Sequence, residues 1–191
     1  TRGYPYVYSG YETFVKQLSE RLILKDCNVT IYCHKGLFKI RPKEIKGIKL
    51  VYVPTIETKI LSQPIHSLLS ILHTYFLRPD VLLVVNSANG PFGLLTKLFK
   101  VPTAINVDGL EWLRPKWKGL GSIYFKWASK MATLFYDQII NDSDEMRKVY
   151  LDLFKRDSKV IAYGANIRKS ENPELINKWN LKQREYYLVI G

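Results

Sequence analysis

The chain of 191 residues is 47% hydrophobic and carries a formal net charge of +12. This length and apolar content suffice for one domain with a full hydrophobic core, and there is no run of about 18 apolar residues to form a membrane-spanning helix. No secretion signal is visible, and two cysteines make neither a disulfide framework nor a metal motif, so we expect a reduced, cytoplasmic setting.

The positive charge fits three kinds of partner: nucleic acid, an anionic membrane face or a phosphorylated substrate. Charge scattered over the surface for solubility fits it equally well. The distribution is uneven, because residues 112–136 contain five cations and no acid. Aromatic residues are interleaved with these cations, as on proteins that lie at a membrane surface.

Apolar periodicity predicts the elements in chain order. A helix begins near Gly10, where Phe14, Leu18 and Leu22 share one face. Further helices are predicted at 65–76, 92–99, 121–136, after Ser143 and at 173–181. Strands are predicted at 28–33, 48–53, 81–85, 103–107, 138–140, 159–162 and 186–190. Strands alternating with helices predict βαβ units, and hence an α/β fold with a Rossmann-like parallel sheet and helices on both faces.

The two ends of this pattern predict an incomplete unit. The helix near Gly10 begins where an open α/β sheet would already have supplied a central strand, and the strand at 186–190 has no helix after it. We therefore expect a sheet that lacks its first strand, in a fragment of a longer chain.

The stretch from Thr103 to Trp117 is the most distinctive part of the sequence. It opens as a strand and breaks at Asp108-Gly109, a pair that favours a tight turn. Beyond the break, carboxylate, indole and cation alternate without apolar periodicity. Ligands of open α/β sheets bind outside the carboxyl ends of the strands, where this loop would lie. The alternative is structural: Asp108 caps the turn and the tryptophans cover the core.

Five loops follow strands, or the position where a strand is expected, and carry turn or polar residues: 2–10, 86–90, 108–117, 141–143 and 163–166. In a doubly wound sheet they converge on one edge, with helix N-termini behind them that favour anions. No dinucleotide fingerprint, phosphate-binding P-loop or serine elbow is present. The three histidines lack metal-ligand spacing, so we expect no metal site.

Several of these segments together resemble bacterial family 4 glycosyltransferases of the rhamnosyltransferase type. The most distinctive match is the run NVDGLEW at 106–112, followed by Lys116-Trp117. The other matching segments are 1–3, 9–14, 86–90, 141–143 and 161–165, in the family's order. The chain departs from the family in having Ser9-Gly10 where two glycines are usual, and Asp108 where many relatives have His.

The resemblance implies a GT-B protein with two Rossmann-like domains. Residues 1–185 would form the N-terminal, acceptor-side domain, and 186–191 the first strand of the C-terminal, donor-binding domain. The implied reaction is a retaining transfer of a sugar, with dTDP-rhamnose as the expected donor, to a lipid-linked saccharide at the cytosolic membrane face. It needs no cofactor or metal. The implied partners are the nucleotide sugar, the acceptor, the membrane surface and the chain's own C-terminal domain, with no nucleic acid.

The resemblance also implies roles for individual residues. Asp108 would be catalytic. The remaining positions fall into three groups: a donor-phosphate loop of Arg2, Gly3, Ser9 and Gly10; acceptor-binding Asn86, Asn89, Gly109, Glu111, Trp112, Lys116 and Trp117; and Asp142, Ser143, Tyr163 and Gly164 at the edge of the site.

Two other functions stay open from the residues alone. A nucleic-acid-binding α/β domain would account for the charge and the tyrosine content, but gives no reason for the carboxylates Asp108 and Glu111. A different enzyme acting on a nucleotide sugar or phosphosugar would use a similar sheet.

Overall fold

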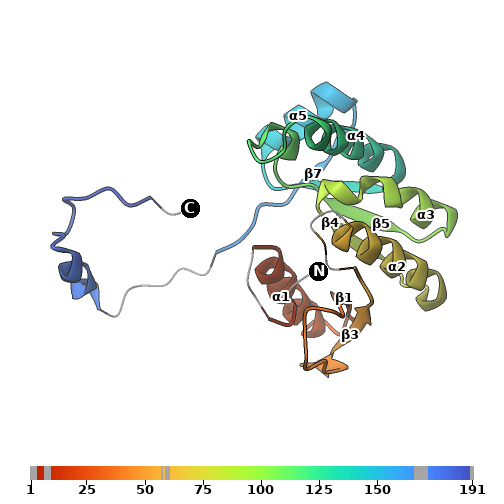
Figure 1. Ribbon diagram of the computed structural model, residues 1–191, viewed down its shortest axis with the longest axis horizontal. Coiled ribbons are helices and arrows are strands. Elements are labelled where there is room, and N and C mark those ends of the chain that lie inside the picture. The colour runs from red at the N-terminus through yellow and green to blue at the C-terminus, as the bar shows by residue number, and fades with distance from the viewer. Residues whose placement is uncertain (1–3, 7–9, 57, 59–60, 166–171, 190–191) are drawn as a thin grey trace.

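The computed structural model describes residues 4–6, 10–56, 58, 61–165 and 172–189, which form two sheets and their helices (Figure 1). The strands are β1 (Thr30–His34), β2 (Glu44–Ile45), β3 (Ile48–Val53), β4 (Leu82–Val85), β5 (Thr103–Asn106), β6 (Gln138–Asn141) and β7 (Lys159–Val160). The α-helices are α1 (Gly10–Ile23), α2 (Ser62–Leu77), α3 (Gly93–Leu98), α4 (Leu120–Phe135) and α5 (Asp144–Phe154). Three 3₁₀ turns are added: η1 (Ser87–Phe92), η2 (Glu111–Leu113) and η3 (Pro173–Trp179).

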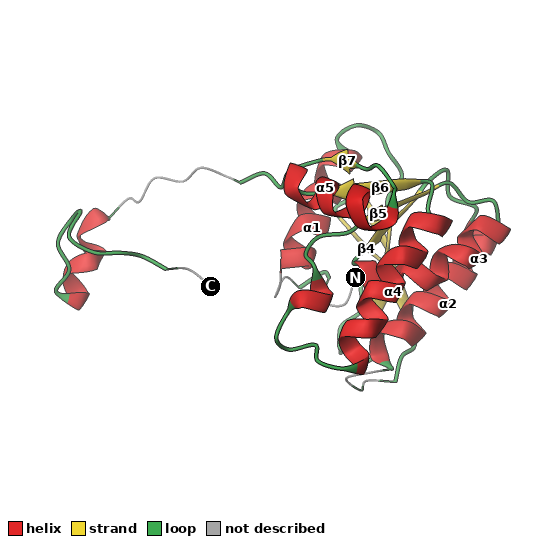
Figure 2. Cartoon of the chain, turned by 90° about the horizontal axis from the view of Figure 1, so that it is seen from above, coloured by secondary structure: helices red, strands yellow, loops and turns green. Residues whose placement is uncertain are grey.

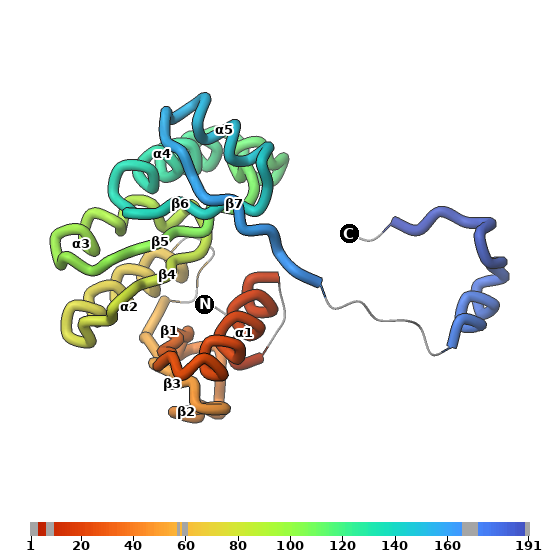
Figure 3. The backbone as a smooth tube through the Cα atoms, turned by 180° about the vertical axis from the view of Figure 1, so that it is seen from behind, coloured from red at the N-terminus to blue at the C-terminus, as the bar shows by residue number. Residues whose placement is uncertain are grey.

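The larger sheet is fully parallel and runs in the order β4-β5-β6-β7 (Figure 3). Its register aligns Val84 with Ile105, and Ile105 with Ile139. Each crossover between these strands carries helical residues, which is the βαβ pattern expected from the sequence. The prediction of a Rossmann-like α/β fold is confirmed.

The smaller sheet has the order β1-β3-β2, with β1 and β3 parallel and β2 antiparallel. The β2–β3 hairpin was not predicted, because β2 is only two residues long. Among the described residues, no strand pairs with the outer edge of β1 or of β4, so the two sheets stay separate. Helix α1 packs on the smaller sheet through Val15 and Ile23.

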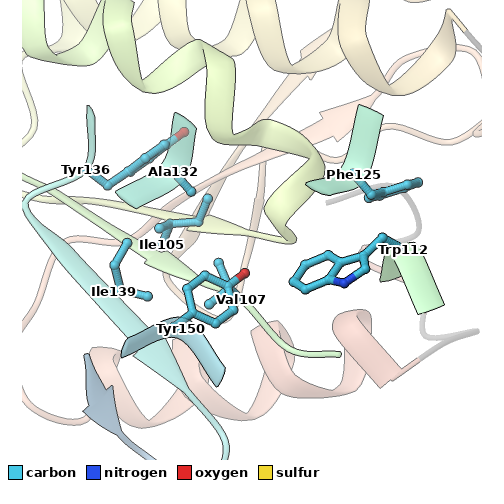
Figure 4. Close-up of a cluster of buried hydrophobic side chains, with 8 residues drawn as sticks. All are labelled: Ile105, Val107, Trp112, Phe125, Ala132, Tyr136, Ile139 and Tyr150. Carbon is cyan, nitrogen blue, oxygen red and sulfur yellow. The ribbon is translucent and has the colours of Figure 1, made fainter. Parts of the chain in front are cut away.

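The main core lies between the parallel sheet and the helices after its strands (Figure 4). Ile105 and Ile139 lie in strands β5 and β6, and Val107 directly follows β5. Helices α4 and α5 and the residue after α4 cover them with Phe125, Ala132, Tyr136 and Tyr150. Helices α2, α3 and α4 lie side by side (Figure 2). Turn η1 approaches α4 so closely that a Cβ at Gly90 would overlap the backbone carbonyl of Ala128. This contact explains why the chain between β4 and α3 needs a glycine there.

Four predicted elements differ in the structure. The helix expected at 173–181 is the 3₁₀ turn η3, which ends at Trp179. The helix expected at 92–99 begins earlier, as η1, and becomes α-helical at Gly93. The strand expected at 159–162 ends at Val160. Residues 186–189 form no strand, and this segment lies apart from both sheets, where no neighbouring strand is available to pair with its backbone. The described part of the chain contains no helix that is long and apolar enough to cross a membrane.

Candidate functional site

Asp108 lies just beyond the carboxyl end of β5, after Val107. Two tyrosines from distant parts of the chain donate hydrogen bonds to its carboxylate. The Tyr11 hydroxyl, from the first turn of α1, donates to Oδ1 of Asp108. The Tyr163 hydroxyl, which follows β7, lies 3.1 Å from Oδ2 of Asp108 and 3.0 Å from Oδ1 of Asn106. The structure therefore brings together two of the five predicted loops, 108–117 and 163–166, with the first turn of α1 that follows loop 2–10. We call the four residues that meet here the Asp108 cluster: Asn106, Asp108, Tyr11 and Tyr163.

The electrostatics of the Asp108 cluster keep both tyrosines protonated. Burial, with added contributions from the Asp108 carboxylate, raises the pKa of Tyr11 and of Tyr163 far above the ordinary value. Both hydroxyls therefore act as neutral donors at physiological pH. In the described part of the chain, no lysine or arginine forms an ion pair with Asp108. The carboxylate is half-buried, so a ligand can still reach it: it can accept from a hydroxyl or face a developing positive charge.

The loop after Asp108 takes its shape from Gly109. Its φ of +75° lies in the left-handed region, where a side chain is strained. A Cβ at this position would also lie 3.2 Å from Nη2 of Arg114. Gly109 thus has a conformational role beside the site, and the turn continues into η2.

Glu111 is buried and is surrounded by donors from its own loop. Nη1 of Arg114 lies 3.0 Å from Oε1, and Nζ of Lys116 lies 3.6 Å from Oε2. The Trp117 indole donates from Nε1 to Oε2 at 2.7 Å. These contacts use both carboxylate oxygens, so Glu111 fixes the loop rather than presenting a free carboxylate to an acceptor.

The two tryptophans of the loop have different environments. Trp112 is only 8% exposed and lies in the main core beside Phe125 (Figure 4), so its ring is not available to stack on a sugar. The resemblance implies that Trp112 lies in the acceptor site. Its buried position instead fits the alternative in which the tryptophans of this loop cover the core. Trp117 is half-buried against Phe125, with ring centroids 4.8 Å apart, and Nζ of Lys116 lies 5.2 Å from the Trp117 ring.

The asparagines after β4 hold the backbone. Asn86 has a φ of +77°, and its side chain accepts a hydrogen bond from the Ala88 amide at 2.8 Å. Asn89 is buried; its side chain accepts from the Ser67 hydroxyl at 2.6 Å and donates to the Val85 carbonyl at 2.8 Å. Both amides are engaged within the protein and position η1.

The remaining predicted residues lie at the ends of other elements. Ser143 caps α5 by accepting from the Met146 amide at 3.4 Å, as predicted. Oδ1 of Asp142 is buried and has no hydrogen-bond partner among the described residues, and its charge contributes to the raised pKa of Tyr163. Gly164 is exposed with open space around it, and Gly10 is the exposed first residue of α1. Arg2, Gly3 and Ser9 lie outside the described residues.

Sequence reasoning placed Phe14 on the apolar face of the first helix, and it assigned neither Tyr11 nor Phe14 to the site. Tyr11 bonds directly to Asp108, and the Phe14 ring meets the Tyr163 ring edge-on with centroids 5.2 Å apart. Their spacing of three residues in the first turns of α1, just after a predicted loop, is the signal that could have found them. Among the described residues, no three His, Cys, Asp or Glu side chains group as metal ligands.

The fold and the Asp108 cluster define an α/β protein with a hydroxyl-lined carboxylate at the carboxyl end of its parallel sheet. Residues 1–166 match the domain of unknown function DUF1972, and the chain belongs to that family. The family is one found in glycosyltransferase-associated proteins. No curated protein matches the chain.

Proposed function

We propose that the chain is the acceptor-side domain of a retaining glycosyltransferase, which transfers a sugar from a nucleotide sugar to a lipid-linked saccharide at the cytosolic membrane face. Rhamnose from dTDP-rhamnose is the proposed donor. The observation that carries the proposal is the Asp108 carboxylate, held by two tyrosine hydroxyls and without a cationic partner in the described chain. The family's occurrence in glycosyltransferase-associated proteins supports the same class.

The chemistry of sugar transfer suits this arrangement. The bond between the anomeric carbon and the diphosphate breaks while the acceptor oxygen forms the new bond, and the acceptor hydroxyl gives its proton to the departing diphosphate. Positive charge develops on the sugar ring during this exchange. A fixed carboxylate beside that ring stabilises the charge, because it is already oriented before the reaction begins. Asp108 also accepts a hydrogen bond from a sugar hydroxyl. The N-terminus of a helix favours anions such as the departing diphosphate, and α1 begins at Gly10, next to Tyr11 of the Asp108 cluster.

A transfer assay tests the proposal. The protein, as encoded in its genome, is incubated with dTDP-rhamnose or with UDP- and GDP-sugars, and with lipid-linked saccharides extracted from bacterial membranes. We expect a product one sugar larger, whose anomeric configuration by NMR matches that of the donor. The matched control is Asp152→Asn, which removes an exposed carboxylate from α5 and should transfer at the wild-type rate. A folded protein that neither binds nor consumes any nucleotide sugar would overturn the proposal.

A further inference from the structure

Helix α4 packs on the core through Phe125 and several small side chains, and it exposes other large apolar side chains. Ala128, Ser129 and Ala132 are fully buried against the core. On the opposite side, Ile123 is 66% exposed and Trp127 is 47% exposed. A surface helix of a soluble domain usually shows the reverse pattern, with large apolar residues inside. The outward side of α4 therefore needs an explanation beyond folding.

The neighbouring helices repeat this pattern. In α2, Ser67, Ser70 and Thr74 are buried, whereas Leu72 and Phe76 are exposed. Helices α2, α3 and α4 lie side by side (Figure 2). None of α2, α3 and α4 contains an aspartate or glutamate, and α3 and α4 carry lysines. The exposed surface of these helices combines apolar and cationic residues, which distinguishes it from a merely hydrophobic patch.

An open groove of about 630 Å³ runs between α4 and the end of α5. Its apolar part includes Ile123, Trp127 and Leu153, and its cationic part consists of Lys126, Lys130 and Lys155. Among the residues that the structure describes, no aspartate or glutamate lines it. We call these six residues the α4/α5 groove. Leu153 of α5 is exposed and lies in the groove rather than in the core.

We propose that the α4/α5 groove docks on the surface of an anionic lipid bilayer. An indole settles at the level of the lipid headgroups, because one part of it is apolar and its N–H is polar. Lysine side chains lie along apolar surface while their ammonium groups reach the lipid phosphates. The groove supplies both elements on one surface, without an acid that the bilayer would repel. This assigns a surface to the membrane location in the proposed function, and the inference itself rests only on the residues of the groove.

The charge argues against a second copy of the chain as the occupant. A symmetric dimer through the groove would bring its lysines toward those of the partner copy, with no acid between them. An acidic partner protein would satisfy the lysines. Such a partner would give no reason for an indole and two aliphatic side chains to be exposed beside these lysines. The bilayer accounts for both features.

Vesicle flotation measures the docking without any sugar substrate, so its failure is distinct from failure of the transfer assay. The protein, as encoded, is mixed with vesicles of phosphatidylcholine alone or with about a third phosphatidylglycerol, where we expect salt-sensitive binding only to the anionic vesicles. Lys126→Gln with Lys130→Gln should lower the partition coefficient about 25-fold, at about fivefold per lysine. The matched control is Leu24→Ser with Lys25→Gln at the end of α1, where an exposed leucine and a lysine are also adjacent.

A second measurement does not depend on removing groove residues. Brominated phosphatidylglycerol should quench the tryptophan fluorescence of the wild-type protein, and Trp127→Phe should abolish most of the quenching while keeping most of the binding. Three outcomes would overturn the proposal: no binding to anionic vesicles, binding that the lysine pair leaves unchanged, or quenching that survives Trp127→Phe. A concentration-dependent dimer that Lys126→Gln and Lys130→Gln strengthen would instead identify the groove as an interface between copies.

Discussion

Asp108 and Glu111 lie three residues apart in one loop, yet different groups meet their charges. Asp108 accepts hydrogen bonds from the neutral hydroxyls of Tyr11 and Tyr163, which come from other parts of the chain. Glu111 is buried and is bound by Arg114, Lys116 and the Trp117 indole, all from its own loop.

The difference separates a carboxylate that can act on a ligand from one that holds the protein together. Two cations neutralise Glu111, and its oxygens are occupied, so little charge is left for a ligand. Hydroxyls orient Asp108 without cancelling its charge. A preorganised charge of this kind is what stabilises a developing opposite charge in a transition state. Glu111 fixes the loop that begins at Asp108, and the two roles are therefore complementary.

Asp108→Asn should give the largest effect, because it removes the charge and keeps the shape. The amide oxygen still accepts from one tyrosine, and the other hydroxyl can accept from the amide nitrogen, so the fold should be retained. We expect the kcat for sugar transfer to fall about a hundredfold, as for loss of a preorganised electrostatic group. The measurement is initial-rate kinetics beside a thermal melt. Wild-type kcat in Asp108→Asn would place the aspartate outside the reaction.

Glu111→Gln should act on stability instead. The change leaves Arg114 and Lys116 without their anion, while Trp117 still donates to the amide oxygen. We expect the free energy of unfolding to fall by about 1–2 kcal/mol, with kcat changed less than about threefold. Urea unfolding measures this, with Glu174→Gln as the control because that glutamate is exposed. A large loss of kcat without a loss of stability would reverse the roles assigned to the two carboxylates.

Tyr163→Phe tests whether the hydroxyls position Asp108. Without this donor, Oδ2 of Asp108 loses its partner and the carboxylate becomes free to rotate. We expect kcat to fall about tenfold, which corresponds to one charge-assisted hydrogen bond, with a smaller change in KM. The control is Tyr32→Phe, which also removes a hydroxyl bonded at 3.0 Å, to Nδ1 of His73, but in the smaller sheet. Equal losses of kcat in both variants would mean that the effect is general destabilisation.

Much of this comparison could be predicted from the sequence. The alternation at 103–107 and the break at Asp108-Gly109 placed Asp108 at the carboxyl end of a strand, and the structure confirms that position. The parallel sheet followed from strands that alternate with helices. The N-cap of α5 at Ser143 followed from local capping chemistry. These features depend on neighbours in the sequence, so spacing and residue type were sufficient to predict them.

The partners of each carboxylate could not be predicted in this way. Tyr11 lies 97 residues before Asp108 in the chain, and only the packing of α1 near the end of β5 brings them together. Trp112 is in the core because η2 turns it inward, which the alternation of polar and aromatic residues concealed. The outward apolar residues of α4 look like core positions in the sequence. They differ from core residues only in which side of the helix meets the sheet.

The smallest expected effect concerns pH, and it separates the two carboxylates by the chemistry of their donors. Burial and Asp108 raise the pKa of Tyr11 in the folded state above its unfolded value near 10, so the folded protein holds this proton more tightly. The resulting stability is fully present below about pH 10 and is lost as the pH rises toward the folded pKa, by at most about 1.4 kcal/mol per pH unit. The Arg114 partner of Glu111 stays charged over this range and adds no such dependence.

Tyr11→Phe should therefore reduce the loss of stability above about pH 10, measured by urea unfolding. Tyr187→Phe should not, because Tyr187 is fully exposed. If Tyr11→Phe and Tyr187→Phe lose stability with the same slope as the wild type, Tyr11 does not hold its proton against Asp108.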